Sequence, residues 1–99
     1  MELTSGEVYT FKMNSAEELI AKVVSATETE ILLKEPVSVA PGPQGLGLVP
    51  SLFTVGAKSE VRLNINNIAL YALTDDSVKA KYIEATSGLI VPDKSIIMG

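Results

Sequence analysis

YTFKMNSAEELIAKVVSATETEILLKE, residues 9–35, carries the strongest structural signal of this chain. Apolar and polar residues alternate along it with the period of two that is typical of β-strands. The alternating runs are residues 8–13, 19–26 and 31–34. Residues 14–16 and 27–29 separate these runs, and their Asn, Ser and Thr side chains favour turns because they hydrogen-bond to nearby backbone. The stretch therefore predicts three short strands joined by two tight turns.

Beyond this stretch the strand pattern continues with one interruption. The third strand is predicted to resume after Pro36 at 37–39, because a proline within a run suits an edge strand or a bulge. Residues 40–50, APGPQGLGLVP, hold three prolines and three glycines, and we expect a loop that is either a plain surface connection or a binding loop. Further strands are predicted at 52–55, 61–65 and 68–73, with turns at 56–58 and at Asn66-Asn67.

The last predicted strand is apolar on both of its faces. Ile68, Leu70 and Ala72 share one face, and Ala69, Tyr71 and Leu73 share the other. A half-solvated strand should show one polar face. We expect this strand either to lie between the barrel and a following helix or to form a subunit interface, and the two explanations are compatible. An apolar edge strand without a partner would invite aggregation.

A helix is predicted at 75–87. Asp75, Asp76 and Ser77 supply N-cap oxygens and negative charge at its start. Ser87-Gly88 is expected to end it, since glycine accepts the left-handed C-cap geometry. Residues 89–91 can add a short strand, and 92–99 are expected to form a tail. The chain is thus predicted to be one mainly β domain over 1–99, with a small, strongly bent, five-stranded antiparallel barrel at 7–73 and a C-terminal helix.

The composition argues against catalysis. The 99 residues contain no histidine and no cysteine, so the commonest general base, thiol nucleophile and zinc ligands are missing. The glycines between 40 and 50 are followed by no Gly-Lys-Ser/Thr, which excludes a phosphate loop of that kind. We expect no catalytic residue, no metal and no cofactor, and therefore not an enzyme.

Charge and hydropathy narrow the range of partners. Twelve carboxylates against eight lysines and arginines give a net charge of −4, which weakens long-range attraction to nucleic acid. A ring that gathers one or two lysines per copy around a pore could still bind RNA locally. No run is long and apolar enough for a bilayer span or a secretory signal, so no membrane partner is expected. A cytoplasmic location is the simplest expectation for a chain without cysteines.

Two stretches resemble the Sm-like family (LSm and Hfq-like proteins) of RNA-associated ring proteins. Residues 9–35 are similar to the first Sm motif, with a strand, a short polar turn, a second strand carrying the small residue Ala21, and a third strand. Residues 61–73, VRLNINNIALYAL, are similar to the second motif, in which a strand reaches a polar elbow and leads into an apolar last strand. The resemblance implies an SH3-like barrel whose copies pair the fourth strand of one with the fifth strand of the next.

The family's base-binding residues are not retained. The usual aspartate and asparagine of the first motif correspond to Thr27 and Ile31, and the Arg-Gly pair of the second corresponds to Asn64 and Ile65. The few residues before Glu7 are not expected to form the family's N-terminal helix, and a helix after Leu73 is expected to replace it. The resemblance therefore implies the barrel and the ring rather than the uridine pocket. The helix and Gly-Leu-Ile-Val-Pro stretch are similar to phage-encoded members, which would place the protein in a host cytoplasm.

Two functional hypotheses follow. In the first, a homo-oligomeric ring of about five to seven copies binds RNA or acts in RNA metabolism. Its predicted RNA contacts are Thr27, Glu28, Asn64, Asn66, Asn67, Lys58 and Arg62, and its predicted interface residues are Ile68, Leu70, Tyr71, Leu73, Val61 and Leu63. In the second, the ring is a scaffold, for instance of a phage particle, and residues 40–50 with Ile96 and Ile97 contact a protein partner.

Overall fold

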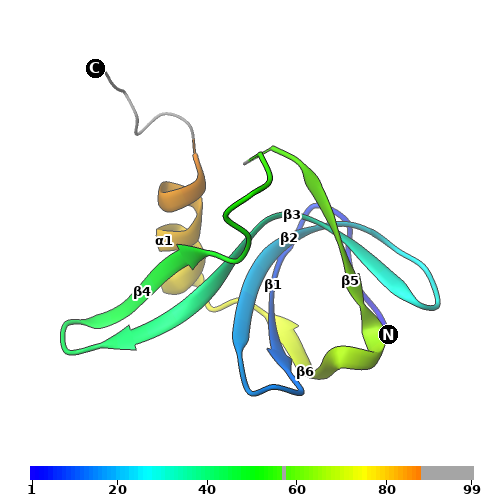
Figure 1. Cartoon of the computed structure of the whole chain (residues 1–99), viewed down its shortest axis with the longest axis horizontal. Coiled ribbons are helices and arrows are strands. Elements are labelled where there is room, and N and C mark those ends of the chain that lie inside the picture. Colours follow the sequence, from blue (N-terminus) through cyan, green and yellow to red (C-terminus); the bar gives the residue numbers. More distant parts are fainter. Residues whose placement is uncertain (57, 88–99) are drawn as a thin grey trace.

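The computed structural model of this chain describes residues 1–56 and 58–87 (Figure 1). It is mainly β, with antiparallel strands followed by one C-terminal helix, as predicted. The strands are β1 (Val8–Met13), β2 (Glu18–Ala26), β3 (Glu30–Gly42), β4 (Gly45–Pro50), β5 (Glu60–Asn64) and β6 (Ile68–Leu73). A short 3-10 helix, η1 (Ile65–Asn67), joins β5 to β6, and α1 spans Asp76–Thr86. The strand predicted at 89–91 and the tail at 92–99 lie outside the described residues.

The six strands form one bent antiparallel sheet. Its order is β4-β3-β2-β1-β6, and β3 also pairs with β5 over residues 30–34, before it reaches β4 at residues 37–42. Two register shifts interrupt the β2–β3 ladder, and such irregularities increase the local twist of a sheet. Within the described ranges β5 and β6 do not pair with each other, so the barrel is not closed. The predicted five-stranded barrel is therefore wrong in its strand number and in its closure.

The inner face of the bent sheet carries the main core. The residues buried there are Tyr9, Phe11, Leu19, Ala21, Val23, Ile31 and Leu33. They occupy alternate positions of β1, β2 and β3, which confirms the alternation predicted from the sequence. Burial of one large apolar side chain stabilises a fold by roughly 1.5–3 kcal/mol, so this cluster is the principal source of stability.

α1 packs on the outer face of the same sheet through Tyr82, which is only 2% exposed. The buried neighbours of Tyr82 are Val8, Ile20 and Val37. Its hydroxyl donates to the carbonyl oxygens of Glu35 (2.9 Å) and Lys34 (3.2 Å). Glu35 has a φ of +53°, a left-handed conformation that is uncommon for any residue other than glycine. It lies where β3 leaves β5 and approaches β4, so α1 holds the bend of β3.

Residues 40–50 form a hairpin and not the predicted loop. They belong to the end of β3 and to β4, which project from the rest of the sheet as an arm (Figure 1). Pro43 and Gln44 make its tip between the paired residues Gly42 and Gly45. Gly45 has a φ of +108°, which glycine adopts without strain. β4 is an edge strand, where proline and glycine are tolerated, and this is why their abundance did not prevent pairing.

The strand predicted at 52–55 is also wrong. Residues 51–56 contain no strand and connect β4 to β5. Phe53 is 82% exposed and Val55 is 48% exposed. An apolar run does not form a strand by itself, because its backbone groups need a partner strand. The turn predicted at 56–58 includes residue 57, which lies outside the described residues.

The start of α1 agrees with the prediction. The Asp75 carboxylate accepts hydrogen bonds from the Ser77 hydroxyl (2.6 Å) and the Ser77 amide (3.1 Å). The bond from the hydroxyl, followed by the bond from the amide, holds the pKa of Asp75 below its ordinary value. Just before this cap, the Thr74 hydroxyl lies 2.8 Å from the hydroxyl of Thr10 and ties the β6–α1 connection to β1.

Candidate functional site

The most distinctive feature of the described residues is a pair of open strand edges on consecutive strands. β6 uses one edge to pair with β1, and β5 uses one edge to pair with β3. No strand within 1–56 and 58–87 pairs with the opposite edge of either one. Each open edge leaves a row of backbone N–H and C=O groups available to another chain.

The elbow between these two strands is held by backbone and asparagine hydrogen bonds. Asn64 caps η1, because its side-chain oxygen accepts from the Asn66 amide (2.9 Å). Asn14, in the β1–β2 turn, donates from its side chain to the carbonyl of Asn66 (2.8 Å) and from its backbone to that of Asn67 (2.7 Å). The elbow therefore has a fixed geometry relative to β1. Asn14 was predicted only as a turn residue, and its role here was missed.

β6 exposes large apolar side chains. Leu70 is 67% exposed, Leu73 is 62% exposed and Tyr71 is 39% exposed. Leu73 lies opposite Tyr9 and Tyr71 lies opposite Phe11, so both are on the inner face of the sheet, where the barrel is open. Leu70 lies opposite Lys12 and is on the outer face. Both faces of β6 thus show apolar surface to solvent.

α1 does not cover this surface. Its buried side chain, Tyr82, packs on β1, β2 and β3, and Leu70 and Leu73 stay exposed. Of the two explanations for the apolar strand, packing beneath the helix is therefore wrong, and a subunit interface stays a prediction. Three further predicted interface residues, Val61, Leu63 and Ile68, are only half-buried. Leu63 and Ile68 pack partly against the inner core.

Asn66 and Asn67 belong to the elbow, and the other predicted RNA contacts fall into two groups. The turn that carries Thr27 and Glu28 lies beside the end of β5, because the Ile65 amide donates to the Thr29 carbonyl (3.0 Å) and Glu30 pairs with Asn64. Thr27 shapes this turn by accepting from the amides of Thr29 (3.2 Å) and Glu30 (3.1 Å). Arg62 and the turn line a small cleft of about 90 Å³. The structure thus brings Thr27, Glu28, Arg62 and Asn64 to one end of the β3–β5 ladder.

Lys58 lies at the opposite end of β5. Its ammonium nitrogen is 3.6 Å from a carboxylate oxygen of Glu35, whereas the Arg62 guanidinium is 3.2 Å from Glu30. Both cations are largely exposed, at 82% for the Lys58 side chain and 72% for that of Arg62. Exposed pairs of this kind contribute little and are screened by salt, so each cation can exchange its carboxylate for a phosphate.

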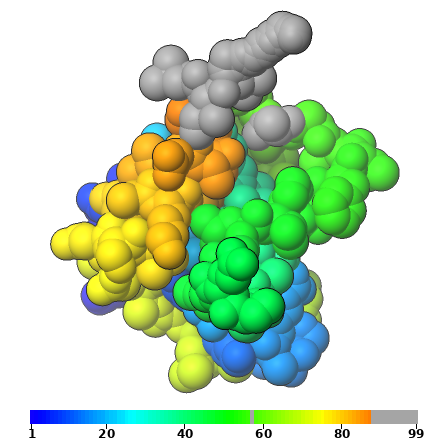
Figure 2. All heavy atoms as spheres, turned by 90° about the vertical axis from the view of Figure 1, so that its left-hand side faces the viewer, coloured from blue at the N-terminus to red at the C-terminus, as the bar shows by residue number. Residues whose placement is uncertain are grey.

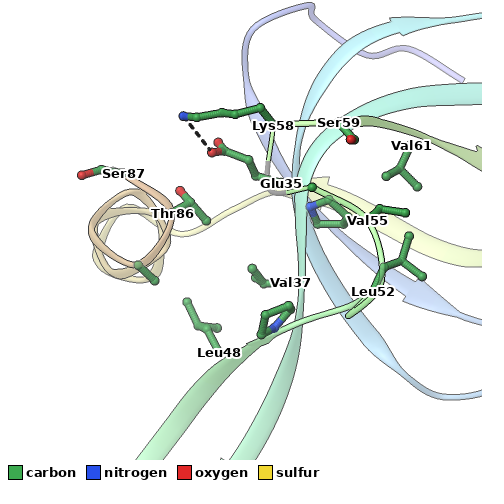
Figure 3. A pocket seen from close by; sticks show the side chains of 14 residues that line it. Glu35, Val37, Leu48, Leu52, Val55, Lys58, Ser59, Val61, Thr86 and Ser87 are labelled. Carbon is green, nitrogen blue, oxygen red and sulfur yellow. Dashed lines mark ion pairs between the residues drawn. The ribbon is translucent and has the colours of Figure 1, made fainter. Parts of the chain in front are cut away.

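A larger hollow of about 320 Å³ was not predicted (Figure 3). It lies between the bend of β3, the β4–β5 connection and the end of α1. Apolar side chains dominate its lining, among them Val37, Leu48, Leu52, Val55 and Val61. The apolar residues at 52–55 carried the signal for it, but they were interpreted as a strand.

The described residues contain no cluster of three or more acidic, histidine or cysteine side chains that could hold a metal ion. None of the helices in the described part of the chain is long and apolar enough to cross a membrane. Comparison with protein-family models and with curated proteins finds no match to this chain. The Sm-like resemblance therefore stays a prediction.

Proposed function

We propose that this chain is a subunit of a homo-oligomeric, Sm-like ring that binds single-stranded RNA, with β6 of one copy paired to β5 of the next. The observation that carries the proposal is the pair of open edges on β5 and β6, one of them lined with exposed Leu70 and Leu73. The two edges belong to the strands that precede and follow the elbow at η1, whose geometry is fixed by its hydrogen bonds.

Pairing between these edges is head-to-tail. Each contact joins the β6 edge of one copy to the different β5 edge of the next. Contacts of this kind close into a ring when the rotation from one copy to the next is a whole fraction of a full turn. Closure leaves neither edge exposed and removes apolar side chains of β6 from water. A ring of about five to seven copies is the expected assembly.

RNA binding rests on the cluster at the end of the β3–β5 ladder. Thr27 and Asn64, which stand where the resemblance implies base contacts, belong to adjacent backbone segments, and Arg62 supplies a positive charge beside them. A ring repeats this cluster once per copy around its axis. Because a phosphate bound by Arg62 releases its counterions, RNA affinity is expected to fall as the salt concentration rises. The Glu30 carboxylate, 3.2 Å from Arg62, competes with the phosphate for this cation.

Matched substitutions test the interface. The double variant Leu70→Lys/Leu73→Lys places two charges on the β6 surface and is expected to yield single subunits in light scattering. Ile83→Lys makes the same chemical change at a 49% exposed position of α1 and should leave the assembly intact. An assembly of unchanged mass in the double variant would refute pairing through β6.

Titration with fluorescent oligo-U and oligo-A at two salt concentrations tests the RNA activity. Arg62→Gln is expected to weaken binding and to reduce its salt dependence, whereas Lys58→Gln, at the far end of β5, should change it less. Absence of binding of either oligonucleotide at low salt would remove RNA from the proposal and leave the ring.

A scaffolding ring is the second candidate. The arm and the β4–β5 connection expose five large apolar side chains: Leu46, Val49, Leu52, Phe53 and Val55. Exposed apolar side chains gathered in one region favour contact with another protein. Figure 2 shows this region beside α1. A ring that forms but binds no oligonucleotide would favour this candidate.

A further inference from the structure

The apolar groove of about 320 Å³ lies against the end of the described chain. Ala85, Thr86 and Ser87, the last described residues, themselves line it. Figure 3 shows Thr86 and Ser87 on one side of the hollow, with Leu52 and Val55 on the other. Whatever follows Ser87 in the chain therefore starts at the rim of this groove.

The lining of the groove is mostly apolar, and part of it is exposed. Leu52 is 44% exposed and Val55 is 48% exposed, and both come from the irregular β4–β5 connection. Val37 and Leu48 form the floor on β3 and β4. Apolar side chains gathered around an open hollow favour an apolar occupant, because filling it removes their surface from water.

The residues that follow Ser87 have matching chemistry. They read Gly88-Leu89-Ile90-Val91-Pro92, three aliphatic residues between a glycine and a proline. A glycine directly after a helix lets the chain reverse its direction. An extended residue spans at most about 3.6 Å, so the three aliphatic residues begin within roughly 10 Å of the rim of the groove.

We propose that this groove is the docking site of the chain's own C-terminal segment, residues 88–99, with Leu89, Ile90 and Val91 as the occupants. Charge supports the same placement. Asp93 follows the aliphatic residues, and Lys58 stands at the rim in a weak, exposed pair with Glu35 that a second carboxylate can share. The proposal does not depend on the ring or on RNA binding.

Engineered disulfides test the placement directly in the full chain, which has no cysteine of its own. The pair Val55→Cys/Ile90→Cys joins the groove to the segment. The control pair Phe53→Cys/Ile90→Cys uses a neighbour that is 82% exposed and does not line the groove. After mild oxidation, the intrachain disulfide is quantified by mass spectrometry of peptides from the unreduced protein.

The expected result is an intrachain yield several-fold higher for the Val55 pair than for the Phe53 pair. Equal yields would overturn the proposal, because a segment without a fixed site samples both cysteines alike. Disulfides formed only between chains would also overturn it and would assign the groove to a second copy. The intrachain yield does not require ring assembly, which the β6 variants test separately.

A thermal measurement supplies the second test. Ile90→Asp places a charge on a residue that should be buried in the groove, and Lys94→Asp introduces the same side chain beyond the aliphatic run. Ile90→Asp is expected to lower the Tm by several degrees and to increase binding of a hydrophobic dye, whereas Lys94→Asp should do neither. A wild-type Tm and dye signal for Ile90→Asp would contradict the docking.

Discussion

The hydroxyl of Tyr82 offers the sharpest test of how this fold is held together. Tyr82→Phe removes that hydroxyl and keeps the ring that packs between α1 and the sheet. The hydroxyl is the donor to the carbonyls of Glu35 (2.9 Å) and Lys34 (3.2 Å), at the point where Glu35 takes a φ of +53°. Loss of one such hydrogen bond costs roughly 1 kcal/mol, and a buried acceptor left unpaired costs about 1–3 kcal/mol.

We therefore expect Tyr82→Phe to lower the free energy of unfolding by about 1–2 kcal/mol. For a domain of this size the corresponding decrease in Tm is on the order of 5–15 °C. Urea denaturation followed by circular dichroism, at one fixed protomer concentration, measures the difference. Tyr71→Phe is the control, because the Tyr71 hydroxyl accepts an exposed hydrogen bond from the Glu2 amide (3.1 Å), whose loss should matter by less than about 0.5 kcal/mol. Equal effects of the two substitutions would refute this assignment.

The same pair of proteins gives a pH prediction. Burial, followed by the charge of Glu35, raises the pKa of Tyr82 well above its ordinary value. The folded state thus keeps the phenol proton at a pH where the unfolded chain, with a pKa of about 10, releases it. The advantage of wild type over Tyr82→Phe should be complete below about pH 10 and shrink as the pH rises further. A constant difference across that range would show that Tyr82 ionises equally in both states.

Three further predictions concern the core, the helix cap and the arm. Phe11→Ala, at a fully buried position, should lower the free energy of unfolding by about 3–5 kcal/mol in urea denaturation, and a loss below about 1 kcal/mol would contradict the core described above. Asp75→Ala should lower the Tm at neutral pH, and Asp75→Asn should lower it less, because the amide oxygen still caps the helix but carries no charge. Because folding lowers the pKa of Asp75, the effect of Asp75→Ala should fade as the pH falls below about 4, and a pH-independent effect would exclude the charged cap. Gly45→Ala has open space for its methyl group, but the alanine must adopt a φ of +108°. This backbone strain should destabilise the arm by about 1–2 kcal/mol and speed amide hydrogen exchange in β4. Unchanged exchange would contradict the strain.

Strand alternation and helix capping could be interpreted from sequence because both depend on neighbours close in the chain. The inner positions of β1 and β2 and the cap at Asp75 were predicted for that reason. The prediction for residues 40–50 was wrong because proline and glycine indicate a turn without revealing its extent. Here Pro43 and Gln44 alone form the tip of a hairpin whose paired strands continue on either side. The strand prediction for residues 52–55 was wrong because a strand needs a partner strand, which the local sequence does not specify.

In the candidate site, too, some residue positions could be predicted from the sequence and others could not. The resemblance aligned both Thr27 and Asn64 with base-binding positions of the family, and the structure brings the two residues to one end of the β3–β5 ladder. Lys58 is close to Arg62 in sequence, yet it precedes β5 and pairs with Glu35. The Arg62 side chain, from the middle of β5, instead reaches Glu30 at the opposite end of the β3–β5 ladder. The Tyr82–Glu35 contact joins residues 47 positions apart, and no local pattern indicates it.

Light scattering on the purified wild-type chain bears most directly on the proposed assembly of β5 and β6 edges. The chain mass is 10.5 kDa, and we expect a single species of about five to seven copies that persists on dilution. A stable 10.5 kDa species at high concentration would mean that the open edges and the exposed leucines of β6 do not join one copy to the next.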